Sequence, residues 1–230
     1  MSITIKVDQY DSDNGLLFKK DTFIFDPGIT ILVGCNGSGK TTLMNQIESK
    51  YRWGPVDGII AKKFSCCDMD NEISRIMQFE SNKDSIHRAT TMIFSSEGER
   101  MAQGLVSAFN WMWNECRNPE TTKIFMLLDS LDSGLDIVNI RMIRDVLKES
   151  AEIVKNDFKK ELFVILSAND YALVEGYECL DIYEGERVTF KDWNDYLAFV
   201  TRSSVIKETR YDEESNSNEN EHDYDSWSKR

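Results

Sequence analysis

The segment 34–41, Gly-Cys-Asn-Gly-Ser-Gly-Lys-Thr, constrains the fold of this chain more than any other feature. It matches the phosphate-binding loop pattern G-x-x-x-x-G-K-[ST] at every fixed position. The apolar run at 29–33 before it is typical of a buried parallel strand, and the run at 42–50 after it is typical of a helix. In this order, the backbone N–H groups of the loop and the positive end of the helix face phosphate oxygens. We therefore expect a phosphate site between these two elements.

This loop supplies the first candidate site residues. Lys40 is expected to reach the β- and γ-phosphates of a bound triphosphate, and the Thr41 hydroxyl is expected to bind Mg²⁺. The glycines are spaced as G-x-x-G-x-G, which excludes the dinucleotide-binding pattern G-x-G-x-x-G. The candidate nucleotide-binding residues of this segment are Asn36, Gly37, Ser38, Gly39, Lys40, Thr41 and Thr42.

Apolar runs and helical patterns alternate along the chain. This alternation predicts an α/β fold with a mainly parallel sheet, antiparallel strands added to it, and a small helical insert at about 63–95. Strands are expected at 3–9, 22–26, 29–33, 59–61, 123–128 and 162–166, a hairpin at 180–190, and helices at 42–50, 97–116, 136–156 and 191–201.

Composition limits the organisation, the partners and the compartment. The 230 residues suit one nucleotide-binding domain at 1–205, followed by an acidic tail at 206–230 that we expect to be disordered. A net charge of −13 does not indicate a nucleic-acid or anionic-membrane partner, although a local basic groove for nucleic acid is left open. Five cysteines without C-x-x-C spacing favour a reduced, cytoplasmic chain, and no apolar run reaches transmembrane length.

A carboxylate follows the next strongly apolar strand. Asp129 comes directly after the run 124–128, and ligands bind at the carboxyl ends of strands in open α/β sheets. Thr41 and Asp129 are therefore the candidate ligands of Mg²⁺.

The residues around Asp129 resemble those of ATP-binding-cassette (ABC) ATPases, whose strand end reads D-E-x-x-[ST]-x-L-D. Asp129 matches the magnesium aspartate, and the run Ser-Gly-Leu-Asp at 133–136 resembles the family's S-A-L-D loop, which faces a partner subunit. The phosphate loop also fits the family pattern, Asn36 included. The resemblance implies ATP and Mg²⁺ as ligands, and it places Asp136 at a site shared by two subunits.

A third segment completes the resemblance. Ser-Ser-Glu-Gly-Glu-Arg at 95–100 is similar to the family signature L-S-G-G-[QE]-R, in which a serine and the helix behind it hold the γ-phosphate on the partner subunit. Ser96, Gly98 and Glu99 are the candidate residues of this match. Read from the residues alone, Ser96 also suits an ordinary helix N-cap, and the two roles are compatible. The resemblance implies a head-to-tail homodimer that ATP closes.

The chain departs from the family at two positions that matter for hydrolysis. Ser130 stands where the family has the glutamate that polarises the attacking water, and a neutral hydroxyl cannot accept that proton. Asn169 stands at the place of the switch histidine, and its amide can bond to the γ-phosphate without carrying positive charge. Asp132 is a candidate substitute carboxylate. These departures predict a slow ATPase with Asp129, Ser130, Asn169 and Asp132 as its candidate catalytic residues.

The resemblance is nearer to the chromosome-maintenance (SMC) and DNA-repair (RecF-type) heads than to transporter subunits, but the chain between Lys40 and Ser96 is too short for their coiled-coil arms. We therefore expect an armless ATPase that switches a separate effector protein and has no membrane partner. Two alternatives stay open, the nucleotide-binding subunit of an ABC transporter and an ATP sensor that does not hydrolyse its ligand. Tyr10 and Phe18 are candidates for contacting the adenine ring.

Overall fold

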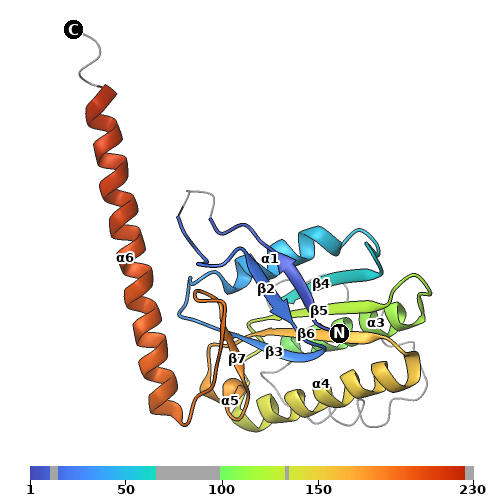
Figure 1. Ribbon diagram of the computed structural model, residues 1–230. Helices are drawn as coiled ribbons and strands as arrows, with labels where there is room; N and C mark the ends of the chain where they lie inside the picture. Colours follow the sequence, from blue (N-terminus) through green and yellow to red (C-terminus); the bar gives the residue numbers. More distant parts are fainter. Residues whose placement is uncertain (11–14, 66–98, 133–134, 226–230) are drawn as a thin grey trace.

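The computed structural model describes residues 1–10, 15–65, 99–132 and 135–225 (Figure 1). Side-chain burial is described for these residues except 65, 99–104 and 210–225. The expected helical insert at 63–95 lies almost wholly outside the described residues, as do the signature positions Ser96 and Gly98.

A six-stranded sheet forms the centre of the molecule, with the strand order β4-β5-β6-β3-β7-β8. Its first five strands in this order pair in parallel, and β8 is added antiparallel to β7, so the predicted α/β fold is confirmed. The strands are β3 (Gly28–Val33), β4 (Ile59–Ser65), β5 (Lys123–Asp129), β6 (Glu161–Ser167), β7 (Cys179–Asp181) and β8 (Glu186–Val188). Because β6 lies between β3 and β5, the carboxyl ends of these three strands meet at one edge.

The sheet is buried on both faces, and β5 shows this most directly. Ile124, Met126 and Leu128 belong to one core, whereas Phe125 and Leu127 belong to the other. Successive side chains of a strand point to opposite faces, so a strand covered on both sides reads as a continuous apolar run. This is why the sequence marks β5 clearly.

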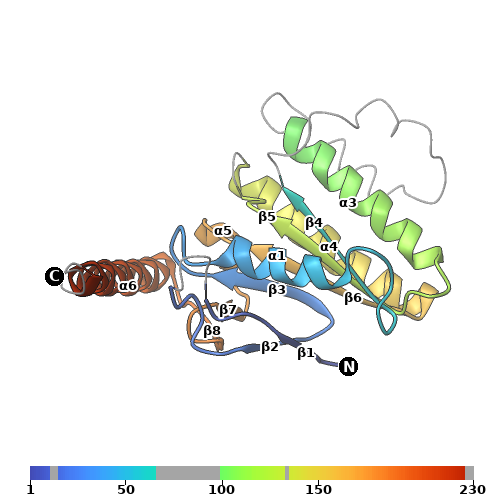
Figure 2. The same cartoon turned by 90° about the horizontal axis from the view of Figure 1, so that it is seen from above.

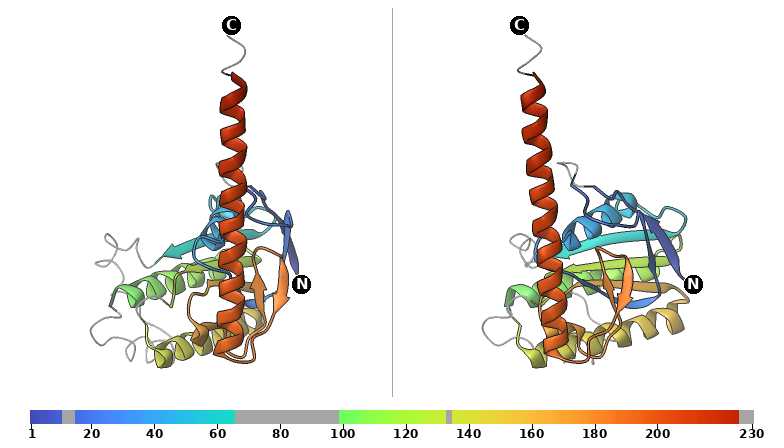
Figure 3. Two further views of the ribbon diagram at one scale, coloured as in Figure 1. Left: turned by 90° about the vertical axis from the view of Figure 1, so that its left-hand side faces the viewer. Right: turned by 60° about the vertical axis from the view of Figure 1, so that its left-hand side comes forward.

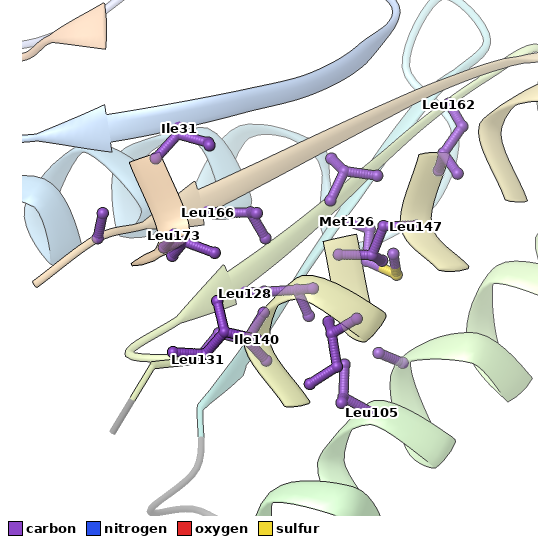
Figure 4. Packing of buried hydrophobic residues seen from close by; sticks show 14 of the residues in the cluster. Ile31, Leu105, Met126, Leu128, Leu131, Ile140, Leu147, Leu162, Leu166 and Leu173 are labelled. Atoms are coloured by element: carbon purple, nitrogen blue, oxygen red, sulfur yellow. The ribbon is translucent and has the colours of Figure 1, made fainter. Parts of the chain in front are cut away.

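Different elements cover the two faces (Figure 2). Helix α1 (Lys40–Tyr51) packs on one face together with an antiparallel pair, β1 (Ile3–Lys6) and β2 (Thr22–Phe25). Helices α3 (Glu99–Arg117) and α4 (Ile137–Phe158) cover the other face. Figure 4 shows Leu105, Ile140 and Leu147 of these helices in one cluster with Met126 and Leu128 of β5.

The chain ends in a long helix, α6 (Trp193–Asp225), which follows the short helix α5 (Tyr171–Val174) and the β7–β8 hairpin. The sequence predicts a helix ending near residue 201 and a disordered tail at 206–230, and the structure corrects this prediction as far as residue 225. No Gly or Pro occurs between residues 193 and 225, so nothing interrupts the backbone hydrogen bonds once the helix has begun. The distal half of α6 projects away from the sheet (Figures 1 and 3).

Two stacked rings tie β5 to β6 in the core beneath α1. Phe125 and Phe163 are fully buried. Their rings stack with centroids 4.5 Å apart and an angle of 2° between the ring planes.

We expect Phe163→Ala to lower the free energy of unfolding by about 3–5 kcal/mol, because it leaves a cavity at a site that is packed on all sides. Urea denaturation followed by circular dichroism measures this loss. Ile24→Ala, at a position that is 57% exposed, should change it by less than about 0.5 kcal/mol. Equal effects of both substitutions would contradict the packing described.

Candidate functional site

The segment 34–41 connects β3 to α1, as predicted. Gly39 is the N-cap of α1 with φ 104°, and Gly37 has φ 76°, a backbone conformation that side chains disfavour. A Cβ atom on Gly39 would lie 3.0 Å from the ring of Phe18. Glycine at these positions therefore lets the loop adopt this backbone conformation without strain.

The loop opens onto a cavity of about 310 Å³ at the carboxyl edge of the sheet. Most of the predicted site residues meet there. The lining residues are Leu17, Asn36, Gly37, Gly39, Lys40, Thr41, Thr42, Asp129, Ser130, Ser167 and Asn169. Leu17 and Ser167 are not among the predicted residues. Ser167 is the last residue of β6, and its place after a strongly apolar run is the sequence signal that could have found it.

Lys40 is 7% exposed, and its ammonium is bound by the loop itself. Its Nζ donates to the backbone oxygens of Gly34 at 2.8 Å and Cys35 at 3.1 Å. Burial lowers the pKa of Lys40 from its usual value, while Cys35, Asp132 and Asp129 oppose that shift. A phosphate group in the cavity would add negative charge next to this buried cation and so favour its protonated form.

Asp129 and Ser130 are joined to β6 through one hydroxyl. The Ser167 Oγ donates to Asp129 Oδ1 at 2.8 Å and accepts the backbone N–H of Ser130 at 2.7 Å. Ser130 adopts φ 57°, the left-handed conformation, as the chain leaves β5. The two positions whose residue types depart from the family pattern, Ser130 and Asn169, both line the cavity.

Thr41 and Asp129 both line this cavity and fit Mg²⁺. Among the residues that the structure describes, no three His, Cys, Asp or Glu side chains gather into a metal cluster. Asp129 offers a carboxylate and Thr41 a hydroxyl, a ligand pair that is typical of Mg²⁺ bound jointly by protein, phosphate oxygens and water.

Asp132 does not line the cavity but holds the loop that follows β6. Its carboxylate accepts the backbone N–H groups of Asn169 at 2.5 Å and Asp170 at 2.7 Å, and the Asn169 Nδ2 lies 3.3 Å away. Asp132 is 8% exposed. These contacts make it a residue that positions Asn169.

The other candidates lie elsewhere. Asp136 is the exposed N-cap of α4 and accepts the Asn139 N–H at 2.8 Å. Ser38 is 3% exposed, and its backbone N–H donates to Cys35. Glu99 is the first residue of α3, and its side chain lies outside the described burial. Neither adenine candidate lines the cavity: Phe18 is fully buried, and Tyr10, 51% exposed, lines a separate groove between β1 and α1.

Helix α6 contacts the backbone of the phosphate loop, which the sequence did not predict. The Ser203 Oγ accepts the backbone N–H of Cys35 at 3.0 Å, and the Lys207 Nζ donates to the backbone oxygen of Asn36 at 3.0 Å. About 170 positions separate these partners along the chain, so local patterns carry no signal of the contact.

No known family model matches the chain, and no curated protein matches it. Among solved structures, it is similar to a protein described as a metal-chelate type ABC transporter in an inward-facing conformation, at 16% identity and TM-score 0.49. That match covers 81% of each chain. It is also similar to a protein from Pyrococcus furiosus described as an ABC transporter ATP-binding protein, at 17% identity and TM-score 0.43, over 74% of this chain and 92% of that one. None of the helices that the structure describes is long and apolar enough to span a membrane.

The contacts of Asp132 generate a prediction about stability. Asp132→Ala leaves the part-buried backbone N–H groups of Asn169 and Asp170 without their acceptor, so we expect the free energy of unfolding to fall by about 1–3 kcal/mol. Asp132→Asn keeps one acceptor oxygen and should lose less. Asp145→Ala, which removes an exposed carboxylate from α4, is the control and should change stability by under about 0.5 kcal/mol. Chemical denaturation of the three variants checks this, and an Asp132→Ala protein as stable as the control would refute the positioning role.

Proposed function

We propose that this chain binds ATP as an ABC-type ATPase with low turnover, and that ATP closes a head-to-tail homodimer which switches a separate effector protein. One observation carries the proposal: Lys40, Thr41 and Asp129, from two different strand–loop segments, line the same cavity as the phosphate loop. A buried lysine, a hydroxyl and a carboxylate at the mouth of a glycine loop are the groups that a Mg²⁺-bound triphosphate requires.

Each of these residues has a defined task in the proposed mechanism. The N–H groups of the loop and the start of α1 bind the phosphates, and Lys40 exchanges its two loop carbonyls for phosphate oxygens. Thr41 and Asp129 would hold Mg²⁺, which supplies charge neutralisation between the phosphates. The Ser167 hydroxyl keeps the Asp129 carboxylate oriented toward the cavity edge.

Low turnover of ATP follows from the residue types of Ser130 and Asn169, which stand where the family has its glutamate and its histidine. Both residues line the cavity, and neither can accept a proton from water at neutral pH. Asp132 is a poor substitute base, because its carboxylate already accepts hydrogen bonds from Asn169 and Asp170. Attack by water therefore proceeds without the general base, which usually contributes about 10²–10⁴ in rate.

The proposed dimer is supported by the surface beside Asp136. Ile137 and Val138, in the first turn of α4, are 55% and 66% exposed. They directly follow the segment 133–136 that resembles the family's partner-facing loop. Exposed apolar side chains at such a position suit burial against a second copy.

We propose a nucleotide-binding domain over 1–205 that acts in the cytoplasm. We also propose that it is nearer to SMC- and RecF-type heads, without their coiled-coil arms, than to transporter subunits. The reduced state of Cys35, Cys116 and Cys179 agrees with that compartment.

Sizing the full chain with and without ATP–Mg²⁺ tests this proposal. The 26.6 kDa chain should elute as a monomer alone and as a dimer with ATP. Lys40→Ala should weaken ATP binding by about 10- to 100-fold, because a charged contact to phosphate is lost, and should stay monomeric. A wild-type protein that remains monomeric at saturating ATP would overturn the homodimer. Recovery with a membrane partner after cell fractionation would favour the transporter-subunit alternative.

A second test concerns the missing base. Ser130→Glu should raise the steady-state rate of ATP hydrolysis at least about tenfold, because it restores a carboxylate beside the attacking water. Ser130→Ala is the matched control, since it shares the left-handed backbone at φ 57° and adds no base. Single-turnover measurements with labelled ATP separate slow hydrolysis from none. A wild-type rate typical of ordinary ATPases, or a Ser130→Glu rate equal to that of Ser130→Ala, would contradict the proposed mechanism.

A further inference from the structure

We infer that Lys207 of α6 is a second phosphate-binding cation of this site, placed to contact the terminal phosphate of a triphosphate and so to favour ATP over ADP. This inference rests on the proposed function and goes beyond it, because it assigns a nucleotide-selecting role to a residue outside every motif of the chain.

The position of the ammonium carries the inference. Lys207 Nζ donates to the backbone oxygen of Asn36 at 3.0 Å, and it lies 3.0 Å from where a Cβ atom of Gly37 would stand. Asn36 and Gly37 both line the cavity. The positive charge of Lys207 therefore lies against the turn of the loop that lines the cavity, although Lys207 is not itself a lining residue.

Helix α6 is anchored so that this position is specified. Tyr196 and Phe199 are 5% and 6% exposed and belong to the core beneath the sheet. One turn before Lys207, the Ser203 Oγ accepts the Cys35 N–H at 3.0 Å. Residues four apart lie on the same face of a helix, so Ser203 and Lys207 contact the loop together. Figure 2 shows α6 passing the end of the sheet at which α1 begins.

The charges of the site explain what a second cation would do. Lys40 is the one cationic side chain among the lining residues that the structure describes, and Asp129 is the one anionic side chain among them. A triphosphate has one more negative group than a diphosphate. Asn169, at the place where the family has a histidine, supplies no positive charge for that group. Asn36, Gly37 and Asn169 line the same cavity, so Lys207, which contacts Asn36, adds positive charge at the wall of that cavity.

The alternative role of these contacts is purely structural: they would hold α6 against the phosphate loop and would not select between nucleotides. The two roles differ in a measurable way. A lysine that fastens the helix affects ADP and ATP equally, whereas a lysine that contacts the terminal phosphate affects ATP alone. The ratio of the two affinities therefore separates them.

Calorimetry on the full chain with ADP and with a non-hydrolysable ATP analogue, both with Mg²⁺, tests the inference. Lys207→Met should weaken binding of the analogue about tenfold and binding of ADP less than twofold. Lys207→Arg keeps the charge and should retain most of the preference. Arg202→Met is the matched control, because it removes an exposed cation from the same helix, where Arg202 lies over the ring of Phe199.

A second measurement needs no variant. Acetylation of the wild-type chain, followed by mass spectrometry, should show Lys207 protected by the ATP analogue more than by ADP, with exposed Lys191 unchanged. Equal weakening of both nucleotides by Lys207→Met, or no weakening, would overturn the inference. If the analogue still binds the wild-type chain and Lys40→Ala weakens that binding about 10- to 100-fold, the proposed function stands although the inference falls. A wild-type chain that binds neither nucleotide would overturn both.

Discussion

The parallel pairing of β6 with both β3 and β5 is the constraint on which the rest of the molecule depends. In this register, Leu32 lies opposite Ser167, and Leu128 lies opposite Leu166. The phosphate loop and the Asp129 segment therefore leave the sheet at the same level, one on each side of β6. A shift of register along either pair would separate Lys40 from Asp129, and the cavity would lose one of its two charges.

Side-chain hydrogen bonds fix the positions of the residues that the strands bring to the cavity. Ser167 connects Asp129 with the backbone of Ser130, and Asp132 connects the loop after β5 with the loop after β6. Each contact satisfies a buried donor or acceptor that would otherwise destabilise the fold. The stability of the protein and the geometry of its site thus share the same few hydrogen bonds, which is why substitutions here are expected to alter both.

The sequence predicts those parts of the molecule whose residue types have few alternatives. A glycine loop after an apolar strand, and a carboxylate after a run buried on both faces, each leave little choice of structure, and both elements were predicted correctly together with the sheet. Ser167 is not predicted as a site residue, because a single serine at the end of a strand does not by itself indicate a binding site. Ser203 and Lys207 are not predicted either, because their contacts join distant parts of the chain. Helix α6 is longer than its polar composition predicts, because a backbone without Gly or Pro can continue as a helix.

The hydrogen bond between Ser203 and the phosphate loop has a mechanical consequence. A helix rises about 1.5 Å per residue, so the part of α6 beyond Ser203 extends about 33 Å to Asp225. If the loop shifts and tilts the helix by about 5° around this contact, the far tip moves by about 3 Å. A small shift of the loop beside the cavity is therefore magnified at the far end of α6.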